Sequence, residues 1–249
     1  MNILDLLNRR RLQSLDADGN ILSLSPTLWW DDDDIPGTTN GDAVSSWTDR
    51  ILEKTVVAHT TNPTLEIAGG IRSVKFSGTN ALTSSEFTEI DFNYNDPFTV
   101  VIQMGNSIVN TGTLVGKQES GLQPVHFQVQ RNTTFSNAVG VNVNALGNAE
   151  ENYFNQSFGT AWTSGSVLTT VFDGTAKGVV SYQNNTSGSM DTLADIGRQS
   201  GSQNQDLYFG ARGNGGGTLG YAYAGSISNI LFFNRALTET EISTLVSNL

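Results

Sequence analysis

The sequence predicts an all-β fold, a two-sheet antiparallel jelly-roll sandwich, and three observations lead to this prediction. Short runs that alternate apolar and polar residues, as at 126–130 and 138–144, are typical of strands with one buried face. Gly, Asn and Ser separate these runs, and 26 Gly against 5 Pro fit many tight turns. Apolar residues at helical spacing occur near the two ends of the chain. Together these features favour a sandwich or jelly roll.

Several segments are expected to form the strands of this sandwich. The run at 98–104 is almost continuously apolar, which fits a central strand. Asp173 and Gly174 form a hairpin signal between two β-rich runs. The expected strands cover 73–76, 98–104, 126–130, 138–144, 167–172, 179–183, 207–210 and 227–233.

The two ends of the chain are predicted to be helical. Apolar residues at spacings near three and four indicate a short helix in the first fifteen residues, and Asp16 to Asn20 is expected to end it in a turn. Near the C-terminus, Thr238 and Glu241 have the spacing of a capping box, and an apolar stripe follows them. We therefore divide the chain into an N-terminal extension, 1–24, and one jelly-roll domain, 25–249.

The extension is interpreted as an assembly anchor. Its apolar residues are too many for a solvated tail and too few for an independent fold, so we expect it to gain order by docking. Its arginines would then meet acidic groups on the partner. The alternative is that the helix folds back over its own sandwich. The proposed anchor residues are Ile3, Leu4, Leu6, Leu7, Arg9, Arg10 and Arg11.

Charge and composition exclude several classes of function. A net charge of −11 argues against nucleic acid as a partner, because phosphate neutralisation needs clustered Lys and Arg. Without Cys the chain has no disulfide framework and no thiol catalysis. The N-terminus lacks the order of a secretory signal, and no stretch approaches the ~18 apolar residues of a membrane span. We expect a protein that is made in the cytoplasm and is not inserted into membranes.

Three segments resemble a known family. They read LSPTLWWDDDD at 24–34, GDAVSSWTD at 41–49 and YAGSISNILFFNRALTETEI at 223–242. In these segments the chain is similar to LamG-like domains of the concanavalin A-like lectin and glucanase superfamily, over about 25–249. The resemblance implies the jelly-roll fold but not one function, because lectins, glycanases and viral structural proteins share it. The chain departs from the family pattern at 50–53, where Arg-Ile-Leu-Glu replaces the usual Ser-Gly-Asn.

Catalysis is not expected. Glu89 and Asp91 match part of the E-x-D-x-E motif of laminarinase-type glycanases, but Asn93 stands where the second Glu should be. A retaining mechanism needs two carboxylates about 5–5.5 Å apart, so the broken motif disfavours it. His59 and His126 are the only histidines, and neither belongs to a recognisable catalytic set. The interpretation is a protein that is not an enzyme.

Two candidate binding sites remain. Asp31, Asp33 and Asp34 belong to an acidic run that calcium would neutralise, as calcium does in relatives of this fold, although a solvated turn needs no metal. Calcium is the one cofactor considered. Aromatic faces with a few polar groups suit sugar rings, and edge packing is the alternative for each residue. The candidate glycan contacts are Tyr153, Trp162, Arg212 and Tyr221.

Three functions follow from the sequence. The first is a bacteriophage virion component, a tail or fibre subunit or a capsid decoration protein. It would be a homo-oligomer that docks on other virion proteins through its extension and binds cell-surface glycans. Its opening motif resembles that of phage structural proteins. The alternative is a bacterial carbohydrate-binding module, and a glycoside hydrolase is the third.

Overall fold

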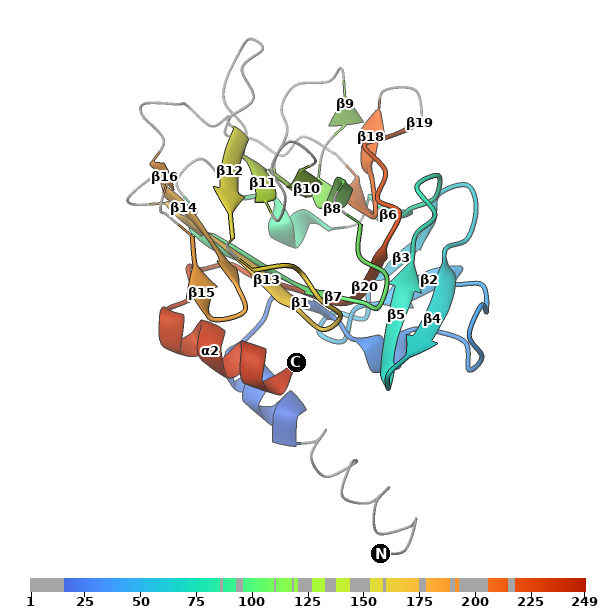
Figure 1. Cartoon of the computed structure of the whole chain (residues 1–249), viewed down its shortest axis with the longest axis horizontal. Coiled ribbons are helices and arrows are strands. Elements are labelled where there is room, and N and C mark those ends of the chain that lie inside the picture. Colours follow the sequence, from blue (N-terminus) through green and yellow to red (C-terminus); the bar gives the residue numbers. More distant parts are fainter. Residues whose placement is uncertain are drawn as a thin grey trace, which may run out of the picture.

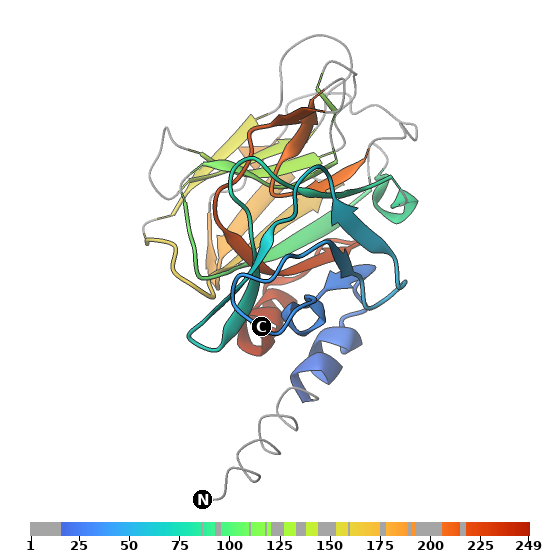
Figure 2. The same ribbon diagram turned by 90° about the vertical axis from the view of Figure 1, so that its right-hand side faces the viewer.

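The computed structural model describes most of the domain and none of the first fifteen residues. The described residues are 16–85, 87–92, 96–109, 111–117, 119–120, 127–132, 138–143, 153–158, 160–174, 178–188, 191–192, 206–214 and 218–249. Two antiparallel sheets pack face to face as a sandwich, with helices below one of them (Figures 1 and 2). The predicted all-β sandwich with short terminal helices is confirmed.

The lower sheet in Figure 1 has nine strands. Its central path runs β15-β14-β13-β7-β20-β5-β4, while β1 also pairs with β20 and β16 with β14. The central strands β7 and β20 are buried along their whole length, which explains their continuous apolar sequences. The strands are β1 Leu28–Trp30, β4 Thr64–Ala68, β5 Ile71–Lys75, β7 Phe98–Met104, β13 Val167–Asp173, β14 Gly178–Gln183, β15 Thr186–Ser187, β16 Asp191–Thr192 and β20 Ser226–Phe233.

The upper sheet has eight strands in the order β12-β11-β10-β8-β17-β6-β3-β2, and a small three-stranded sheet, β19-β18-β9, lies beside it. The upper strands are β2 Ser46–Thr48, β3 Thr55–Ala58, β6 Leu82–Ser84, β8 Gly112–Lys117, β10 Phe127–Asn132, β11 Ala138–Val143, β12 Tyr153–Ser157 and β17 Leu207–Phe209. The small sheet contains β9 Glu119–Ser120, β18 Arg212–Asn214 and β19 Thr218–Gly220.

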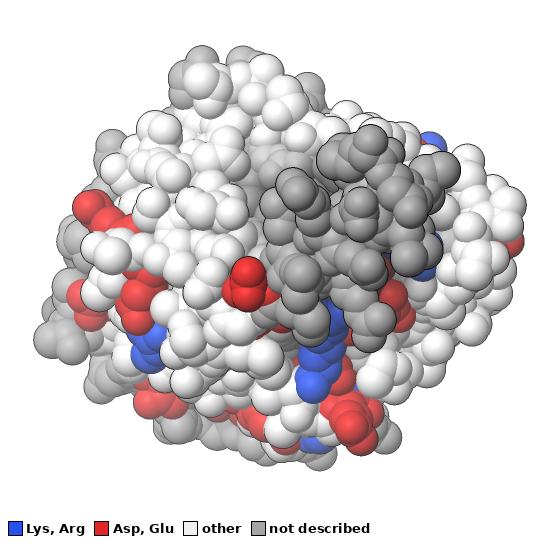
Figure 3. Space-filling view, turned by 90° about the horizontal axis from the view of Figure 1, so that it is seen from below, with Lys and Arg blue, Asp and Glu red and all other residues white. Residues whose placement is uncertain are grey.

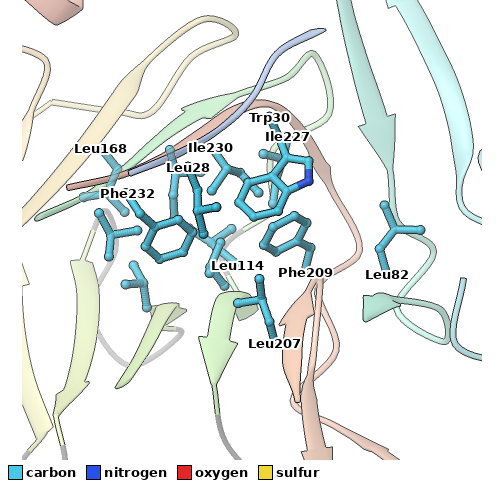
Figure 4. Close-up of a cluster of buried hydrophobic side chains, with 14 of the residues drawn as sticks. Leu28, Trp30, Leu82, Leu114, Leu168, Leu207, Phe209, Ile227, Ile230 and Phe232 are labelled. Atoms are coloured by element: carbon cyan, nitrogen blue, oxygen red, sulfur yellow. The ribbon is translucent and has the colours of Figure 1, made fainter. Parts of the chain in front are cut away.

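The main core lies between the two large sheets, and Trp30 is at its centre (Figure 4). The Trp30 ring meets Phe209 from the upper sheet edge-on, at 4.8 Å between centroids, and Phe232 from the lower sheet at 6.1 Å. Its indole N–H donates to the carbonyl of Trp47 at 3.2 Å, so burial leaves this nitrogen paired. Alternation along β1 places the neighbouring Trp29 on the opposite face of the sheet.

A second apolar cluster covers the outer face of the nine-stranded sheet. Trp29 and Leu231 from the sheet pack there against Ile242 and Leu245 of α2, Glu239–Asn248. The predicted capping box is confirmed, since the Thr238 hydroxyl accepts from the Glu241 amide and the Glu241 carboxylate accepts from the Thr238 amide. Because α2 packs on Trp29 and Leu231, it completes the fold by covering an apolar sheet face. Seen from below, the surface of the molecule shows more acidic than basic side chains (Figure 3).

The N-terminal segment differs from the sequence prediction in one respect. Residues 16–23 are helical, so the turn expected from Asp16 to Asn20 is wrong. The helix ends instead where Ser25 takes a left-handed φ of 58° and Pro26 follows, which excludes a further turn. Ile21 is 1% exposed in the cluster below the sheet, so this part of the extension folds back on its own domain. The anchor residues 3–11 lie outside the described residues.

A truncation tests the contribution of this helix to stability. A chain that begins at residue 25 is expected to be about 2–4 kcal/mol less stable than one that begins at residue 16. The longer chain keeps the buried Ile21 and the contact of Asp18 with Arg50. Urea denaturation of both chains measures the difference, and equal midpoints would contradict a structural role for this helix.

Candidate functional site

The outer face of the eight-stranded sheet carries a row of polar and aromatic residues in register. Thr83 pairs with Tyr208, which pairs in turn with Gly116, and Gly116 pairs with Gln128. The backbone register continues to Asn142 and Tyr153, one of the predicted glycan contacts, but the side chains of these two residues lie outside the described part of the structure. Because side chains alternate along each strand, residues in register belong to the same face. The topology therefore forms a polar strip from residues that are far apart in the sequence.

Gln128 anchors the middle of this strip. Its neighbours Phe127 and Val129 point into the main core, so Gln128 faces the other way. The Gln128 Nε2 donates to the hydroxyl of Thr113 at 2.6 Å and to the Oε1 of Gln130 at 2.8 Å. Gln128 and Thr113 are both buried, and these bonds satisfy polar groups that burial would otherwise leave unpaired.

The β18–β19 hairpin lies against one end of the strip. Tyr208, Ala81 and Ala211 form a small apolar cluster there, separate from the main core, and Leu219 and Ala222 pack on it. The contact is close, since a Cβ added at Gly213 would lie 2.8 Å from the Tyr208 ring. The hairpin is therefore held in a defined position above the sheet.

The same hairpin brings together two of the predicted glycan contacts. Arg212 lies at the start of β18, and its Cζ is 4.0 Å from the centroid of the Tyr221 ring. Tyr221 directly follows β19 and is 63% exposed. Its backbone has a left-handed φ of 47°, uncommon for a non-glycine residue, and the amide of Thr113 holds its carbonyl at 2.7 Å. The ring is thus an exposed platform backed by a guanidinium.

Trp162 does not belong to this surface. It is 7% exposed and lies in the main core, where Phe158 meets its ring edge-on at 5.6 Å and the Arg131 guanidinium lies 4.9 Å from its centroid. Its role as a glycan contact is therefore corrected to one in the core. The side chain of Tyr153 lies outside the described part of the structure, and its strand β12 is four strands from β17 in the sheet order. Of the four predicted contacts, Arg212 and Tyr221 form a contact pair.

The acidic run at 31–34 surrounds an arginine. The Arg50 guanidinium contacts Asp31 at 2.7 Å and Asp18 at 3.1 Å, and its Nε donates to Asp34. Arg50 also lies 4.8 Å from the centroid of the Trp29 ring, and Asp33 is exposed. Within the described residues, no three acidic or histidine side chains are arranged to hold a metal ion. The predicted calcium ligands Asp31, Asp33 and Asp34 thus form no metal cage here, and Arg50 supplies the positive charge.

Asp31 and Asp32 are a coupled pair with raised pKa values. Burial raises the pKa of Asp31 to about 8, against the opposing effects of Arg50 and the Asp33 amide. Burial also raises the pKa of Asp32, and a hydrogen bond joins the two side chains. Two adjacent carboxyl groups, one buried and one half-buried, share a proton more readily than they carry two charges, so the pair titrates as a unit.

The two acidic residues of the partial glycanase motif, Glu89 and Asp91, both form ion pairs with lysines. Glu89 lies in the 3-10 turn η2, Thr88–Ile90, and accepts a hydrogen bond from Lys54 Nζ at 2.5 Å. Although burial opposes it, this bond lowers the pKa of Glu89 below its usual value. Asp91 contacts the buried Lys117, whose ammonium also donates to the carbonyl of Phe87 at 2.6 Å. A general acid needs a raised pKa, so Glu89 is poorly suited to protonate a glycosidic oxygen.

Comparisons by sequence and by structure give different results. No family model matches the chain, and a search of curated proteins finds no match. Among solved structures, the Ruminococcus gnavus IT-sialidase CBM40 bound to alpha2,3 sialyllactose matches with a TM-score of 0.58 and 14% identity, over 70% of this chain and 95% of that one. None of the described helices has the length and apolar character needed to span a bilayer.

Two whole sialidases match over part of their length. The K499G mutant of NanB sialidase from Streptococcus pneumoniae matches with a TM-score of 0.56 and 21% identity, over 69% of this chain. The match spans 27% of that sialidase, about a quarter of its length. The Trypanosoma rangeli sialidase matches with a TM-score of 0.53 and 14% identity, over 98% of this chain and 39% of that one. These likenesses concern the fold alone: the chain is a two-sheet antiparallel β-sandwich similar to the matched parts of these proteins.

Proposed function

We propose that this chain is a non-catalytic carbohydrate-binding domain whose ligand lies on the Tyr221 ring beside Arg212. The contact between an exposed, rigidly held aromatic ring and a guanidinium carries this proposal. The C–H face of a sugar ring packs on an aromatic ring, while arginine N–H groups pair with the oxygens of the sugar.

An acidic sugar suits this position best. The chain carries a net charge of −11, so an anionic ligand needs a local positive group to overcome repulsion. Arg212 supplies that charge, and the planar guanidinium fits a carboxylate in two parallel hydrogen bonds. The compared carbohydrate-binding module from Ruminococcus gnavus was solved with sialyllactose, whose terminal sugar carries a carboxylate group. We therefore propose sialylated glycans as the ligand class.

The virion role expected from the sequence has less support than its alternative. The structural matches named above are sialidases and a carbohydrate-binding module. The matched protein that this chain spans almost completely is the carbohydrate-binding module, whereas the two enzymes are matched over a quarter to two-fifths of their length. The pairing of Glu89 and Asp91 with lysines also disfavours a glycoside hydrolase. The carbohydrate-binding module is therefore the better reading.

Calorimetric titration of sialyllactose into single variants tests the proposal. Arg212→Ala is expected to lower affinity about 10- to 100-fold, because a charged hydrogen bond contributes about 1.5–3 kcal/mol. Tyr221→Ala is expected to lower it about 3- to 10-fold through loss of the stacking surface. Leu52→Ala is the matched control, since Leu52 is 42% exposed in the turn between β2 and β3.

The outcome is clear in either direction. Binding by the wild type and the Leu52→Ala variant, with loss in both site variants, supports the proposal. No binding of sialyllactose by the wild type, or equal affinity in all four proteins, contradicts it.

A further inference from the structure

A groove lies beside the Tyr221 platform and shares the same hairpin. Its volume is about 370 Å³, within the usual range for small-molecule sites. One wall contains His59, Thr60 and Thr79, and the other contains Thr218, Leu219 and Ala222. Tyr221 lies between Leu219 and Ala222 in sequence, so a ligand on its ring is next to the groove.

The wall opposite the hairpin is fixed before any ligand arrives. The amide of His59 donates to the carbonyl of Ala81 at 3.0 Å, which extends the pairing of β3 with β6. Asn80 accepts from the amide of Ser77 at 2.9 Å and donates to the carbonyl of Asn62 at 3.1 Å. These bonds hold the turn that carries Thr79, so the groove needs little rearrangement to bind.

The chemistry of the groove indicates an uncharged, hydroxyl-rich ligand. Among the described residues that line it, none carries a carboxylate, ammonium or guanidinium group. Three threonine hydroxyls can both donate and accept, while Leu219 and Ala222 offer an apolar surface. The Nδ1 of His59 is buried and has no hydrogen-bond partner in the described structure. A buried nitrogen without a partner is costly, and a rotation of the imidazole that turns it towards the groove would let a ligand hydroxyl satisfy it.

We infer that this groove binds the neutral sugar that is linked to the acidic sugar, so that the domain recognises two adjacent sugars of an oligosaccharide. This inference rests on the proposed function, because it takes Tyr221 and Arg212 to hold the acidic unit. The charged residue of the ligand lies at the arginine, and the uncharged residue enters the threonine-lined groove. His59 is then a specificity-determining residue that a monosaccharide does not reach.

The test compares free sialic acid with sialyllactose, which adds two neutral sugars. The wild type is expected to bind sialyllactose about 5- to 10-fold more tightly than sialic acid, the size of one or two added hydrogen bonds. His59→Ala is expected to remove this preference while leaving the affinity for sialic acid unchanged. Thr218→Trp is a second variant: Thr218 is exposed in an edge strand, so the new ring can fill the groove without disturbing the core.

Thr61→Ala is the matched control, because Thr61 is exposed and close in sequence but does not line the groove. It should keep the preference for sialyllactose. Equal binding of the two ligands by the wild type, or an unchanged preference in both groove variants, overturns the groove proposal and leaves the proposed function standing. If the wild type binds neither ligand, the proposed function fails as well.

Discussion

Replacing Gly112 by alanine is expected to destabilise the protein by about 2–5 kcal/mol, from left-handed backbone strain plus steric overlap. Gly112 has a φ of 113°, which residues with a side chain rarely adopt. A Cβ there would lie 2.5 Å from the Cα of Tyr223 and 2.8 Å from the carbonyl oxygen of Ala222. These are backbone atoms, so no rotamer change relieves the overlap. Urea denaturation measures the loss.

The neighbouring Gly116 supplies a matched control. It lies in the same strand, its φ is not positive, and an added Cβ would be 3.4 Å from its nearest neighbour, the Thr113 side chain. Gly116→Ala should therefore change stability by less than about 1 kcal/mol. Similar losses in both variants would show that the contact between Gly112 and the 222–223 segment does not govern stability.

Stability is also expected to fall as the pH rises from about 4 to about 8. Burial raises the pKa of Asp31 to about 8 from an ordinary value of 3.8. In this interval the folded protein therefore holds a proton that the unfolded chain has released, and folding is favoured less as protons become scarce. Each pKa unit corresponds to about 1.4 kcal/mol, so the expected decline amounts to several kcal/mol.

Asp31→Asn should flatten this part of the pH profile. Asparagine resembles the protonated carboxyl group, so the variant should match the wild type near pH 5 and exceed its stability near pH 9. Asp33→Asn is the control, because Asp33 belongs to the same run but is exposed. A wild-type profile that does not decline between pH 5 and 9 would contradict the assignment.

At acidic pH the stability of the protein is expected to change in the opposite direction, falling as the pH falls. The hydrogen bond from Arg235 and those of the capping box lower the pKa of Glu241 to about 2. That stabilisation is present above the unfolded pKa and is lost as the pH falls towards 2. The free energy of unfolding is thus expected to be largest at mildly acidic pH.

The strands that sequence predicts best are those whose environment is uniform along their length. The runs at 98–104 and 227–233 coincide with β7 and nearly with β20, because both are buried on both faces. The helix at 16–23 escaped prediction because its residues look like turn formers, and the apolar cluster that buries Ile21 includes Leu231 and Ile242, which are distant in the sequence. Local propensity yields to tertiary packing at such positions.

In the candidate site, too, the sequence predicts what depends on neighbouring residues and misses what depends on tertiary packing. Arg212 and Tyr221 belong to one hairpin, so the fold brings these two candidate residues into contact. Trp162 was a candidate on the same grounds, yet packing against Arg131 and Phe158 buries it. His59 and the polar strip depend on the order of strands in the sheet, which alternation cannot reveal. The sequence did mark residues 50–53, because they depart from the family pattern. Arg50 in this segment is the counter-ion of the acidic run at 31–34.

The hydrogen bond between Asn20 and Asn248 fixes where attachments to this domain emerge. It brings the N-terminal helix beside the end of α2, below the nine-stranded sheet, while the β18–β19 hairpin lies at the top of the molecule (Figure 1). A tag, a surface or a further polypeptide joined at the C-terminus therefore leaves on the side away from Tyr221. Immobilising the domain through its C-terminus should leave the proposed sugar-binding face open, and several copies mounted this way would present those faces in one direction.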